Sequence, residues 1–329
     1  MQKVAVVVLN YNGRKHLERF LPSVVHHSPD ASIVVADNCS SDDSVSFLEK
    51  SYPSVRIIKL EKNHGFAGGY NEALKQVDAT YYLLLNSDVE VTFNWIPPML
   101  DFLEKNERYA ACQPKIKSFL KKQYFEYAGA AGGFLDRHGY PYCRGRIFNK
   151  LEEDTGQYNS EIDIDWSSGA CMLIRSTAFT SIGGFDKDFF AHMEEIDLCW
   201  RLRNEGHLLR SIPDSTVYHL GGGTLDANNP FKTYLNFRNG LWLLLKNLPQ
   251  NLLIKRLFSR ILLDWLASGK FLVEGRIRHA FAVFKAHYSF LLTVKKFGRK
   301  RALKKIQPST KSILYQYFIK HRQTYRQIQ

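Results

Sequence analysis

The sequence lacks several features by which common protein classes are recognised. No run of about 18 consecutive apolar residues occurs, so no transmembrane helix is predicted. Its five cysteines include no C-x-x-C pair, which argues against a disulfide framework and a zinc knuckle and favours a reducing compartment. An apolar stretch lies at residues 3–9, but no cleavage site of small residues follows it, so no signal peptide is predicted.

Acidic residues are scarce in the carboxyl-terminal part of the chain. Residues 241–329 hold 19 lysines and arginines but only Asp264 and Glu274, a net charge of +17, whereas residues 1–240 carry −4. Such a basic block attracts polyanions: anionic lipid, nucleic acid or a phosphorylated substrate. We therefore predict a near-neutral domain over 1–240 and an amphipathic, helical, basic region over 241–329.

The first 120 residues alternate between predicted strands and helices. Strands are predicted at 3–9, 32–37, 55–60 and 81–86, and helices at 14–27, 42–50 and 67–77. Ser40 or Ser41 is expected to cap the second helix. This order predicts an α/β fold with a doubly wound, mostly parallel sheet and helices on both faces. Ligands of such sheets bind beyond the carboxyl ends of the strands, so the chemistry is expected just after each of them.

Polar loops follow all four predicted strands. They are Asn10-Tyr11-Asn12-Gly13, Asp37-Asn38-Cys39-Ser40-Ser41-Asp42, Asn63-His64-Gly65-Phe66-Ala67-Gly68-Gly69-Tyr70-Asn71 and Asn86-Ser87-Asp88. Each alone would be an ordinary turn or helix cap, but four at one edge of a sheet favour a ligand site. None has the G-x-G-x-x-G spacing of a dinucleotide dehydrogenase or forms a Walker A loop, which argues against both of these ways of holding a nucleotide.

Asp88 ends the apolar strand LLLNSD. A carboxylate at the mouth of a buried strand contributes little to stability, but it suits Mg²⁺ or Mn²⁺, which prefer oxygen ligands and bridge phosphate oxygens. The alternative is a strand-end acid that caps the next helix.

A second group of charged residues lies between 183 and 224. Glu194 and Glu195 begin a predicted helix over 194–203, and because adjacent helical residues point about 100° apart, one is expected to face the site and the other solvent. His219 lies between a strand and a glycine run, where it is either structural or a metal ligand. Asp197 and Arg201, four residues apart, are interpreted as an ion pair on the helix surface.

Seven segments, taken together and in order, resemble family 2 glycosyltransferases of the GT-A fold, particularly the bacterial rhamnosyltransferase-like branch. The segments are VVVLNYNG (6–13), ADNCSSDDS (36–44), NHGFAGGYN (63–71), LLLNSDVEV (83–91), SSGACMLIR (167–175), GGFDKDFFAHMEEIDLCWRL (183–202) and VYHLGGGT (217–224). They cover roughly residues 1–240, and the later region matches only loosely.

The resemblance implies a nucleotide-sugar site built from these segments. Asn10 and Asn12 would line the nucleotide pocket, and Asp37 would hydrogen-bond the uracil or thymine ring. The stretch from Gly65 to Asn71 would pack near the base, ribose and diphosphate. The residues expected to bind the nucleotide sugar are Asn10, Asn12, Asp37, Asn38, Gly65, Phe66, Gly68, Gly69, Asn71, Asn86 and Gly169.

The resemblance also implies a metal site and a catalytic base. Asn86-Ser87-Asp88 stands where the family has its D-x-D motif, so Asp88 is the expected ligand of Mg²⁺ or Mn²⁺ and Asn86 replaces the first acid. His219 resembles the metal ligand that the family has further along the chain than the D-x-D motif. Glu194-Glu195 stands at the family's Glu-Asp motif, whose second acid is the base. Glu195 is one methylene longer than aspartate, which leaves the choice between Glu194 and Glu195 open.

The implied reaction is inverting, metal-dependent sugar transfer from dTDP-rhamnose or a UDP-hexose to a hydroxyl of a glycan or lipid-linked acceptor, in cell-surface polysaccharide synthesis. A sugar nucleotidyltransferase would need a glycine-rich, basic first loop, which NYNG is not. Nucleic-acid binding is not expected, because the basic tail lacks a recognisable motif and the four polar loops would go unexplained. A non-catalytic sugar-nucleotide-binding protein is a further alternative, against which Asp88 and Glu195 argue.

The basic region contains two predicted amphipathic helices. In 252–267 the apolar band comprises Leu252, Leu253, Ile254, Leu257, Phe258, Ile261, Leu262, Trp265 and Leu266, with Lys255, Arg256, Ser259, Arg260 and Asp264 on the other side. Residues 280–297 repeat the mixture and run into Lys295, Lys296, Arg299, Lys300, Arg301, Lys304 and Lys305. The region is either a structural subdomain with a solvated basic face or a peripheral anchor. The second alternative predicts a cytoplasmic protein bound to the inner, anionic face of the cytoplasmic membrane.

Overall fold

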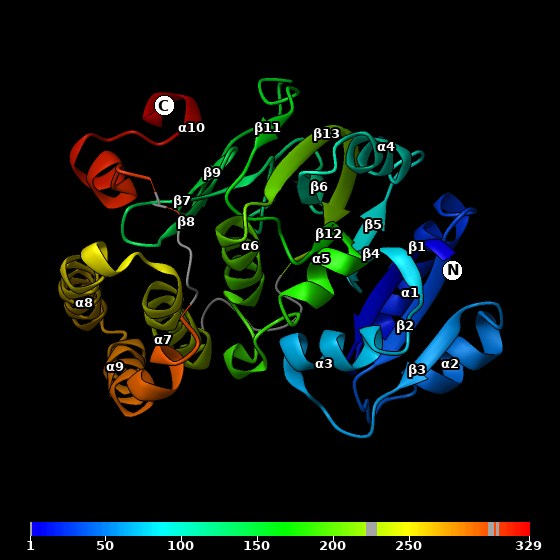
Figure 1. Ribbon diagram of the computed structural model, residues 1–329, viewed down its shortest axis with the longest axis horizontal. Helices are drawn as coiled ribbons and strands as arrows, with labels where there is room; N and C mark the ends of the chain where they lie inside the picture. The colour runs from blue at the N-terminus through cyan, green and yellow to red at the C-terminus, as the bar shows by residue number, and fades with distance from the viewer. Residues whose placement is uncertain (1, 222–228, 302–305, 307–308) are drawn as a thin grey trace.

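The computed structural model describes residues 2–221, 229–301, 306 and 309–329. A central sheet with helices packed against it forms most of the molecule, and the carboxyl-terminal helices lie together at one end (Figure 1). Gly222, Gly223 and Thr224 of the last matching segment, and Lys304 and Lys305 of the basic tail, lie outside the described residues.

The first four strands form the predicted parallel sheet. They are β1 (Gln2–Asn10), β2 (Ser32–Asp37), β3 (Arg56–Lys59) and β4 (Ala79–Asn86). Their order in the sheet is β3-β2-β1-β4, and all of these neighbours run parallel. Asn10 pairs in register with Asp37, and Leu9 with Asn86. The polar loops after β1, β2 and β4 therefore start at the same edge of the sheet, as the sequence predicted.

The first helices are close to their predicted positions. Helix α1 (Arg14–His27) has the predicted bounds, whereas α2 (Ser44–Ser51) and α3 (Gly65–Leu74) are each shifted by two or three residues at one end or both. The prediction that Ser40 or Ser41 caps α2 is wrong, because Asp43 is the N-cap residue. The Ser40 hydroxyl instead accepts hydrogen bonds from Asn10 and from the backbone of Asn12.

Beyond β4 the sheet becomes mixed. Strand β12 (Cys171–Arg175) runs antiparallel to both β4 and β6 (Tyr109–Ser118), and β13 (Leu208–His219) runs parallel to β6. The short strand β5 (Val89–Val91) pairs with the end of β13, so that His219 is opposite Val89. This pairing brings His219 beside Asp88. Strand β11 (Ile162–Asp163) completes this sheet at the edge of β13.

Helices cover both faces of the sheet, as predicted. On β1, Val4, Val6 and Val8 pack in the same core as residues of α1, α2 and α4 (Pro97–Lys105). Ala5 and Val7 belong to the opposite core, which includes residues of α3, α5 (Ser176–Ser181) and α6 (Glu194–Asn204). Successive side chains of a strand point to opposite faces, which explains this alternation. A smaller sheet contains β7 (Gly133–Leu135), β8 (Pro141–Cys143), β9 (Arg146–Ile147) and β10 (Lys150–Leu151).

The carboxyl-terminal region is helical, as expected. It comprises α7 (Pro230–Asn247), α8 (Gln250–Val273) and α9 (Ile277–Gly298), followed by a π-helical turn (Tyr315–Ile319) and α10 (Tyr325–Ile328). The proposed division at residue 240 falls within α7. None of the helices in the described ranges is long and apolar enough to cross a bilayer. Arg260 and Asp264, which were expected on the solvated side of 252–267, are buried, because they pair with each other and Asp264 accepts a hydrogen bond from Tyr140.

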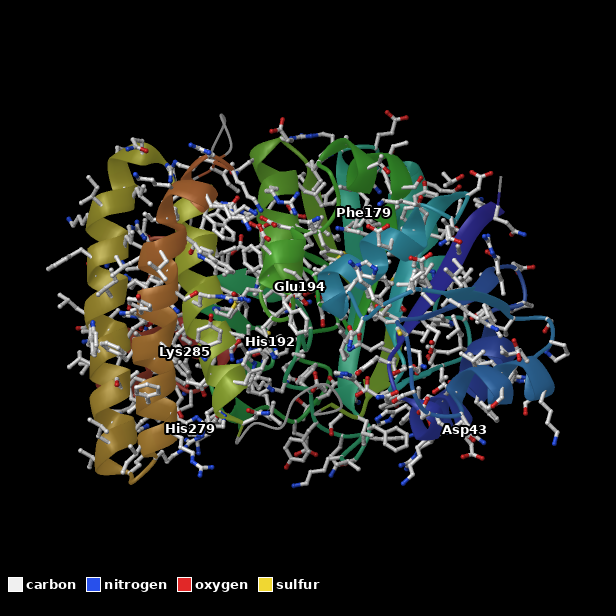
Figure 2. The ribbon with its side chains drawn as sticks, turned by 90° about the horizontal axis from the view of Figure 1, so that it is seen from below. Asp43, Phe179, His192, Glu194, His279 and Lys285 are labelled. Atoms are coloured by element: carbon white, nitrogen blue, oxygen red, sulfur yellow. The ribbon has the colours of Figure 1, made fainter. Side chains whose placement is uncertain are left out.

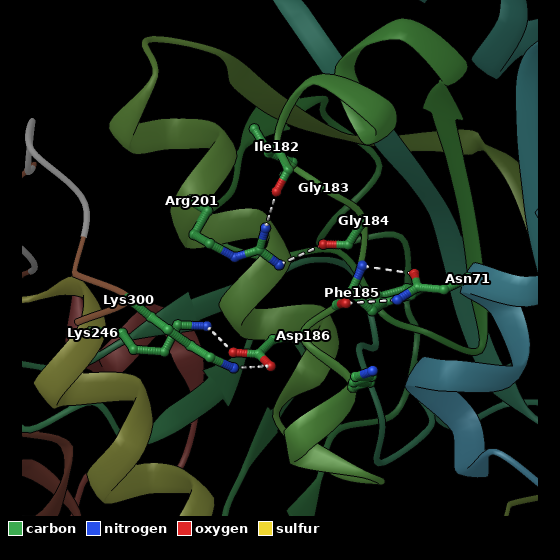
Figure 3. A pocket seen from close by; sticks show the side chains of 10 residues that line it. Asn71, Ile182, Gly183, Gly184, Phe185, Asp186, Arg201, Lys246 and Lys300 are labelled. Carbon is green, nitrogen blue, oxygen red and sulfur yellow. Dashed lines mark hydrogen bonds and ion pairs between the residues drawn. The ribbon is translucent and has the colours of Figure 1, made fainter. Parts of the chain in front are cut away.

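A buried ion cluster joins α7 to α6. Lys246 Nζ of α7 lies 2.7 Å from an Asp186 oxygen and 2.8 Å from Asp197 Oδ2 (Figure 3 shows Lys246 with Asp186). Arg201 Nε also lies 2.8 Å from Asp197, which is fully buried. The predicted ion pair between Asp197 and Arg201 is therefore confirmed, but its expected position on the helix surface is wrong, since contacts with α7 cover it. Removing one partner of such a cluster typically costs about 3–5 kcal/mol.

Candidate active site

The loops after β1 and β2 are held together by buried side chains. Asn10 Nδ2 donates hydrogen bonds to Asp37 Oδ1 at 3.0 Å and to Ser40 Oγ at 3.2 Å. The other Asp37 oxygen accepts from the backbone N–H of Ser40 at 2.9 Å. Each carboxylate oxygen has two lone pairs, so this arrangement leaves each Asp37 oxygen able to accept one more hydrogen bond.

Asn12 and Asn38 extend this network. Asn12 is exposed, has φ 50°, and accepts a hydrogen bond at 2.7 Å from the backbone N–H of Ser41. Asn38 is buried and donates to Asn63 Oδ1 and to the carbonyl of Gly65, both at 3.0 Å. Hydrogen bonds thus connect the loops after the first three strands at the edge of the sheet where the sequence analysis expects a nucleotide.

The glycine-rich segment was predicted to be partly a loop, but Gly65 to Asn71 all lie within α3. A Cβ on Gly69 would come within 2.9 Å of Leu9 Cδ1 and 3.1 Å of Asn38 Nδ2. The glycine therefore allows α3 to pack closely against the ends of β1 and β2. Gly68 makes a similar close approach, because a Cβ there would lie 2.9 Å from the Cβ of His64.

Asn71 is not brought to the same place as the other predicted residues. Its side chain donates to the carbonyl of Phe185 at 2.7 Å and accepts from the Phe185 N–H at 3.0 Å. It lines a separate cavity of about 410 Å³ with Gly184, Asp186 and Lys300 (Figure 3). Its position therefore indicates a structural role, fastening the turn after α5 to α3.

A cavity of about 150 Å³ brings together half of the other predicted residues. From the prediction it contains Phe66, Asn86, Asp88, Gly169, Glu194, Glu195 and His219. These residues come from β4, β13, α3, α6 and the turn before β12, which are far apart in the sequence. The cavity is also lined by Ser168, His192 and Lys232, which the sequence did not single out.

Asp88 and His219 are in direct contact within this cavity. Asp88 Oδ1 lies 3.1 Å from His219 Nε2, and both residues are buried. The other ring nitrogen, Nδ1, lies 3.3 Å from a carboxylate oxygen of Glu126, which is also buried. Burial alone would lower the pKa of His219, but Glu126 and Asp88 outweigh it and raise this pKa to about 10. Burial would raise the pKa of Asp88, but the His219 charge and hydrogen bonds outweigh it and lower this pKa.

The chemistry of this pair fits a divalent cation. A carboxylate oxygen and an imidazole nitrogen that face one cavity are suitable ligands for Mn²⁺ or Mg²⁺. Within the described ranges no three acidic, histidine or cysteine side chains are grouped closely enough to hold a metal by themselves. Such a cation would therefore need further ligands from substrate phosphate and water, as is usual for Mg²⁺. Metal binding would release the proton that His219 carries.

Both acids of the Glu194-Glu195 pair line the cavity, so the prediction that one of them faces solvent is wrong. Figure 2 shows Glu194 and His192 in the interior of the molecule, between the sheet and the carboxyl-terminal helices. No hydrogen-bond partner for Oε2 of either glutamate is found in the described part of the chain. Burial raises the pKa of Glu195 to about 7. Burial, with the adjacent Glu195 charge, raises the pKa of Glu194 well above its ordinary value.

The segment before these acids has an unusual backbone. Phe190, His192 and Met193 all have positive φ angles, of 65°, 67° and 73°. Such conformations are unfavourable for residues with a Cβ and persist only where the surroundings fix them. Here the fully buried amide nitrogen of Asn239, on α7, lies 2.8–3.0 Å from the carbonyl oxygens of Phe189, Ala191 and His192, which share its two N–H donors. Sequence reasoning missed Asn239, because nothing in the helical pattern around it indicates which loop its amide contacts.

We expect Asn239→Ala to lower the rate of sugar transfer strongly while lowering the stability of the fold only moderately. Loss of the amide leaves three buried carbonyls without this donor, which costs about 1–3 kcal/mol and releases the turn that positions Glu194 and Glu195. We expect kcat to fall at least about tenfold, because small displacements of a catalytic group have large effects on rate. The measurement is steady-state kinetics together with thermal unfolding.

Asn247→Ala is the matched control. Asn247 is also buried on α7, but its amide donates to Asp197 and to Leu243 rather than to the 189–192 segment. A similar loss of stability with kcat largely kept is expected for this variant. Equal kcat losses in the two variants would show that Asn239 has no specific effect on the acids.

Comparison with known proteins decides the family. The model of the family described as "Glycosyl transferase family 2" matches residues 5–183, more than half of the chain. The chain belongs to glycosyltransferase family 2. The match covers β1 to β4, the Asn86-Ser87-Asp88 segment and the turn before β12. It ends before Glu194, so the placement of Glu194, Glu195 and His219 rests on the tertiary structure.

Two relatives of this family 2 glycosyltransferase are named as rhamnosyltransferases. The chain is 29% identical over 237 residues to the N-acetylglucosaminyl-diphospho-decaprenol L-rhamnosyltransferase of Mycobacterium tuberculosis, with 65% of this chain and 75% of the relative covered. It is 24% identical over 221 residues to the rhamnosyltransferase WbbL of Escherichia coli, with 66% and 83% covered.

Solved structures agree on the fold. Staphylococcus aureus TarS in complex with UDP-GlcNAc matches with a TM-score of 0.57 at 16% identity, over 91% of this chain and 84% of that chain. The mannosyltransferase PcManGT from Pyrobaculum calidifontis, in complex with GDP-Man and Mn²⁺, matches with a TM-score of 0.54 at 11% identity, over 88% and 87%. At these identities the likeness establishes a shared GT-A-like fold.

Proposed function

We propose that this glycosyltransferase moves a sugar, with inversion of the anomeric carbon, from a nucleotide diphosphate to an acceptor hydroxyl. The observation that carries the proposal is the 150 Å³ cavity, in which two carboxylates with raised pKa values share a space with the Asp88–His219 pair. One group suits deprotonation of an acceptor, and the other suits binding of a diphosphate through a cation.

The donor we propose is dTDP-rhamnose, with a UDP-hexose as the alternative. Rhamnosyl transfer stands in the names of the M. tuberculosis and E. coli relatives. In this chain the loops that contain Asn10, Asn12, Asp37 and Asn38 would hold the base and ribose. Asp37 would accept a hydrogen bond from the ring N–H of uracil or thymine. Phe66, Gly169 and Asn86, which line the cavity itself, would contact the sugar and diphosphate.

The metal we propose is Mg²⁺ or Mn²⁺, held by Asp88 and His219. When bound there, it would supply positive charge to the leaving diphosphate. Lys232, from the first turn of α7, lines the same cavity and would add to the positive potential around the diphosphate.

Glu195 is the base in this proposal. It would take the proton of the acceptor hydroxyl while that oxygen forms a bond to the anomeric carbon and the bond to the diphosphate oxygen breaks. The nucleoside diphosphate leaves from the opposite face, so the configuration inverts without an enzyme nucleophile. A base with a pKa near the working pH combines a useful basic fraction with a strong driving force. Glu194, whose pKa is raised further by its neighbour, would stay protonated and would not compete for the proton.

The acceptor we propose is a glycan or lipid-linked glycan used in cell-surface polysaccharide synthesis, at the cytoplasmic face of a membrane. A lipid-linked diphosphate sugar is named for the M. tuberculosis relative. The division of labour we propose is that residues 1–240 form the catalytic domain and residues 241–329 place it near such an acceptor. The contacts of Lys246 and Asn239 mean that this second region also supports the catalytic turn.

The raised pKa of Glu195 predicts how the rate depends on pH. The general base acts in its charged form, and its pKa is about 7, so the rate of transfer should rise with pH up to and through 7. Well below that value kcat/KM for the acceptor should fall about tenfold per pH unit. A rate profile at saturating Mn²⁺ measures this, with thermal unfolding as the control for acid denaturation. A flat profile between about pH 5.5 and 8 would contradict the assignment.

A panel of nucleotide sugars tests the proposed function. The protein should be stabilised against thermal unfolding by one donor class in the presence of Mn²⁺, and it should slowly hydrolyse that donor without an acceptor. Stabilisation by dTDP-rhamnose over UDP-hexoses would support the donor assignment. If a donor stabilises the protein but is neither hydrolysed nor transferred to any sugar acceptor, the result would favour the non-catalytic alternative.

A further inference from the structure

Helix α8 buries an ion pair against the protein and exposes several of its large apolar residues. Arg260 and Asp264 are 3% and 0% exposed and form an ion pair at 2.8 Å. His287 of α9 lies 3.3 Å from the other Asp264 oxygen. Ile254 and Phe258, by contrast, are 78% and 63% exposed. A helix at a water-facing surface normally has the opposite arrangement.

Helix α9 shows a second apolar stripe facing outward. Its exposed apolar residues recur at intervals of three and four, which places them on one side of the helix. They are Ile277, Phe281, Phe284, Tyr288, Leu291 and Leu292. Ala282, Val283 and Ala286, on the buried side, are smaller. Most of the larger apolar side chains between Ile277 and Leu292 are therefore on the outside, whereas Phe290 is buried.

The two stripes meet. Trp265 of α8 lies with its ring centroid 6.3 Å from that of Phe284 on α9, and Phe284 stacks on Phe281 at 6.3 Å. Figures 1 and 2 show α8 and α9 side by side at the edge of the molecule, beyond α7. We call this surface the α8–α9 apolar face. It comprises Ile254, Phe258, Leu262, Trp265, Leu266, Leu272, Val273, Ile277, Phe281, Phe284, Tyr288, Leu291 and Leu292.

We propose that the α8–α9 apolar face is inserted into the headgroup layer of an anionic bilayer. Exposed apolar patches of this extent are rare on monomeric soluble proteins and mark interaction surfaces. The structure offers two kinds of occupant, a bilayer and a second copy of this chain, and the charge around the face distinguishes them.

The charge around this face is almost entirely positive. The exposed charged residues of the two helices are Lys255, Lys270, Arg278, Lys285, Lys295 and Lys296, of which Lys296 pairs with Asp188. Glu274 and Arg299 are exposed and directly follow α8 and α9. Glu274 lies 3.6 Å from Lys270, and residues 241–329 as a whole carry +17. In a symmetric dimer through this face the same basic patches would meet, and such like-charge contacts are destabilising. Anionic lipid is complementary to both the charge and the apolar surface.

This inference deepens the proposed function, because its use to the enzyme rests on a lipid-linked acceptor. Helix α7 connects the two places. Its first turn contributes Lys232 to the 150 Å³ cavity, and its later residues bind α9 through Tyr234 to Ser289 at 3.1 Å and Trp242 to Thr293 at 2.8 Å. Helices α9 and α7 thus lie between the cavity and a bilayer on the outer side of α9, so that the apolar face and the cavity are joined through α7.

Vesicle flotation with the full chain tests the inference. We expect the protein to float with vesicles of phosphatidylcholine mixed with phosphatidylglycerol at low salt, and much less with phosphatidylcholine alone. Raising the salt to about 1 M should weaken binding, because the screening length then falls to about 3 Å. Each charge reversal, Arg278→Glu or Lys295→Glu, should lower the partition coefficient at least about fivefold.

Substitutions in the apolar face provide the decisive comparison. The double variant Phe258→Ser/Phe281→Ser should lower the partition coefficient at least about tenfold. Phe93→Ser is the matched control, since Phe93 is 84% exposed in the loop between β5 and α4 and should not affect binding. Both variants should keep the wild-type melting temperature within a few degrees, because each removes an exposed side chain.

Three outcomes would overturn the inference. They are failure of the wild type to float with anionic vesicles, flotation that the double variant keeps, and a stable dimer in solution that the double variant dissociates. The last would assign the face to a second copy of the chain. Mn²⁺-dependent stabilisation by a nucleotide sugar is measured on the same samples. If no nucleotide sugar stabilises the protein, the result would count against the proposed function. If a nucleotide sugar stabilises the protein but the protein does not bind vesicles, the result would count only against the membrane inference.

Discussion

Replacing Glu195 with glutamine is expected to abolish sugar transfer while leaving donor binding intact. The amide has nearly the same shape but cannot accept a proton from the acceptor hydroxyl. Loss of a general base typically costs about 10²–10⁴ in rate, so kcat should fall at least ~10²-fold. Donor affinity should stay close to wild type, because the loops of Asn10, Asp37 and Asn38 that would hold the nucleotide are separate from α6. Single-turnover transfer and thermal stabilisation by the donor measure the two quantities.

Glu194→Gln is the matched control, since Glu194 lines the same cavity and its pKa is also raised. If Glu194 is protonated at neutral pH, glutamine mimics its working form, and the variant should keep most of its activity. The Glu195→Gln variant should also lose the rise of rate with pH, whereas Glu194→Gln should keep it. If Glu194→Gln abolishes transfer and Glu195→Gln does not, Glu194 is the base and the alignment with the family's Glu-Asp motif is wrong by one residue.

Replacing Asp88 with asparagine is expected to remove the dependence of activity on Mn²⁺ together with most of the activity. Asp88 is one of the two cavity residues proposed to hold the cation, and it contacts the other, His219, at 3.1 Å. Loss of charge stabilisation on a leaving group typically costs about 10²–10³ in kcat. Binding of Mn²⁺ with a nucleoside diphosphate, followed by thermal unfolding, provides a measurement that does not depend on turnover. Full activity of Asp88→Asn, still stimulated by Mn²⁺, would exclude the assignment.

The Glu126→Gln variant tests whether Glu126 orients His219, the proposed metal ligand, without itself binding the metal. Glu126 lies 3.3 Å from the outer nitrogen of His219 and is not among the residues that line the cavity. Partners of this kind orient a histidine ligand, and their loss typically weakens metal binding about 10–100-fold. We therefore expect a higher Mn²⁺ requirement in Glu126→Gln with kcat largely restored at saturating metal. Asp88→Asn should show no such rescue.

The grouping of the polar loops could be predicted, because the order of the strands determines where these loops lie. Parallel strands end at one edge of a sheet, so Asn10, Asp37 and Asp88 could be grouped without knowing any contact. The bounds of α1 and β2 agree with the prediction to the residue, since a helical or strand period is a local property. The family resemblance placed Glu194, Glu195 and His219, and these residues line the same cavity as Asp88.

The features that could not be predicted depend on which elements pack together. Asn239 and Glu126 lie in unremarkable local sequence, and their partners, the 189–192 segment and His219, are remote along the chain. The spacing of Asp197 and Arg201 predicts an ion pair on a helix surface, but Lys246 of α7 also pairs with Asp197 and covers it. Both acids of α6 face the cavity because three residues just before them adopt positive φ, which no pattern in that segment indicates.

By itself, then, the sequence determined the parallel half of the sheet, the helices on both faces, the polar edge of the site and the basic character of residues 241–329, since each depends on periodicity or composition. Tertiary structure alone decided the pairing of β5 with β13 that joins Asp88 to His219, the turn that Asn239 holds, and the orientation of α8. The apolar and charged sides of α8 are both visible in the sequence. Which of them faces the protein was decided by partners on other elements, because Tyr140 and His287 satisfy the buried Arg260–Asp264 pair and leave the apolar side outside.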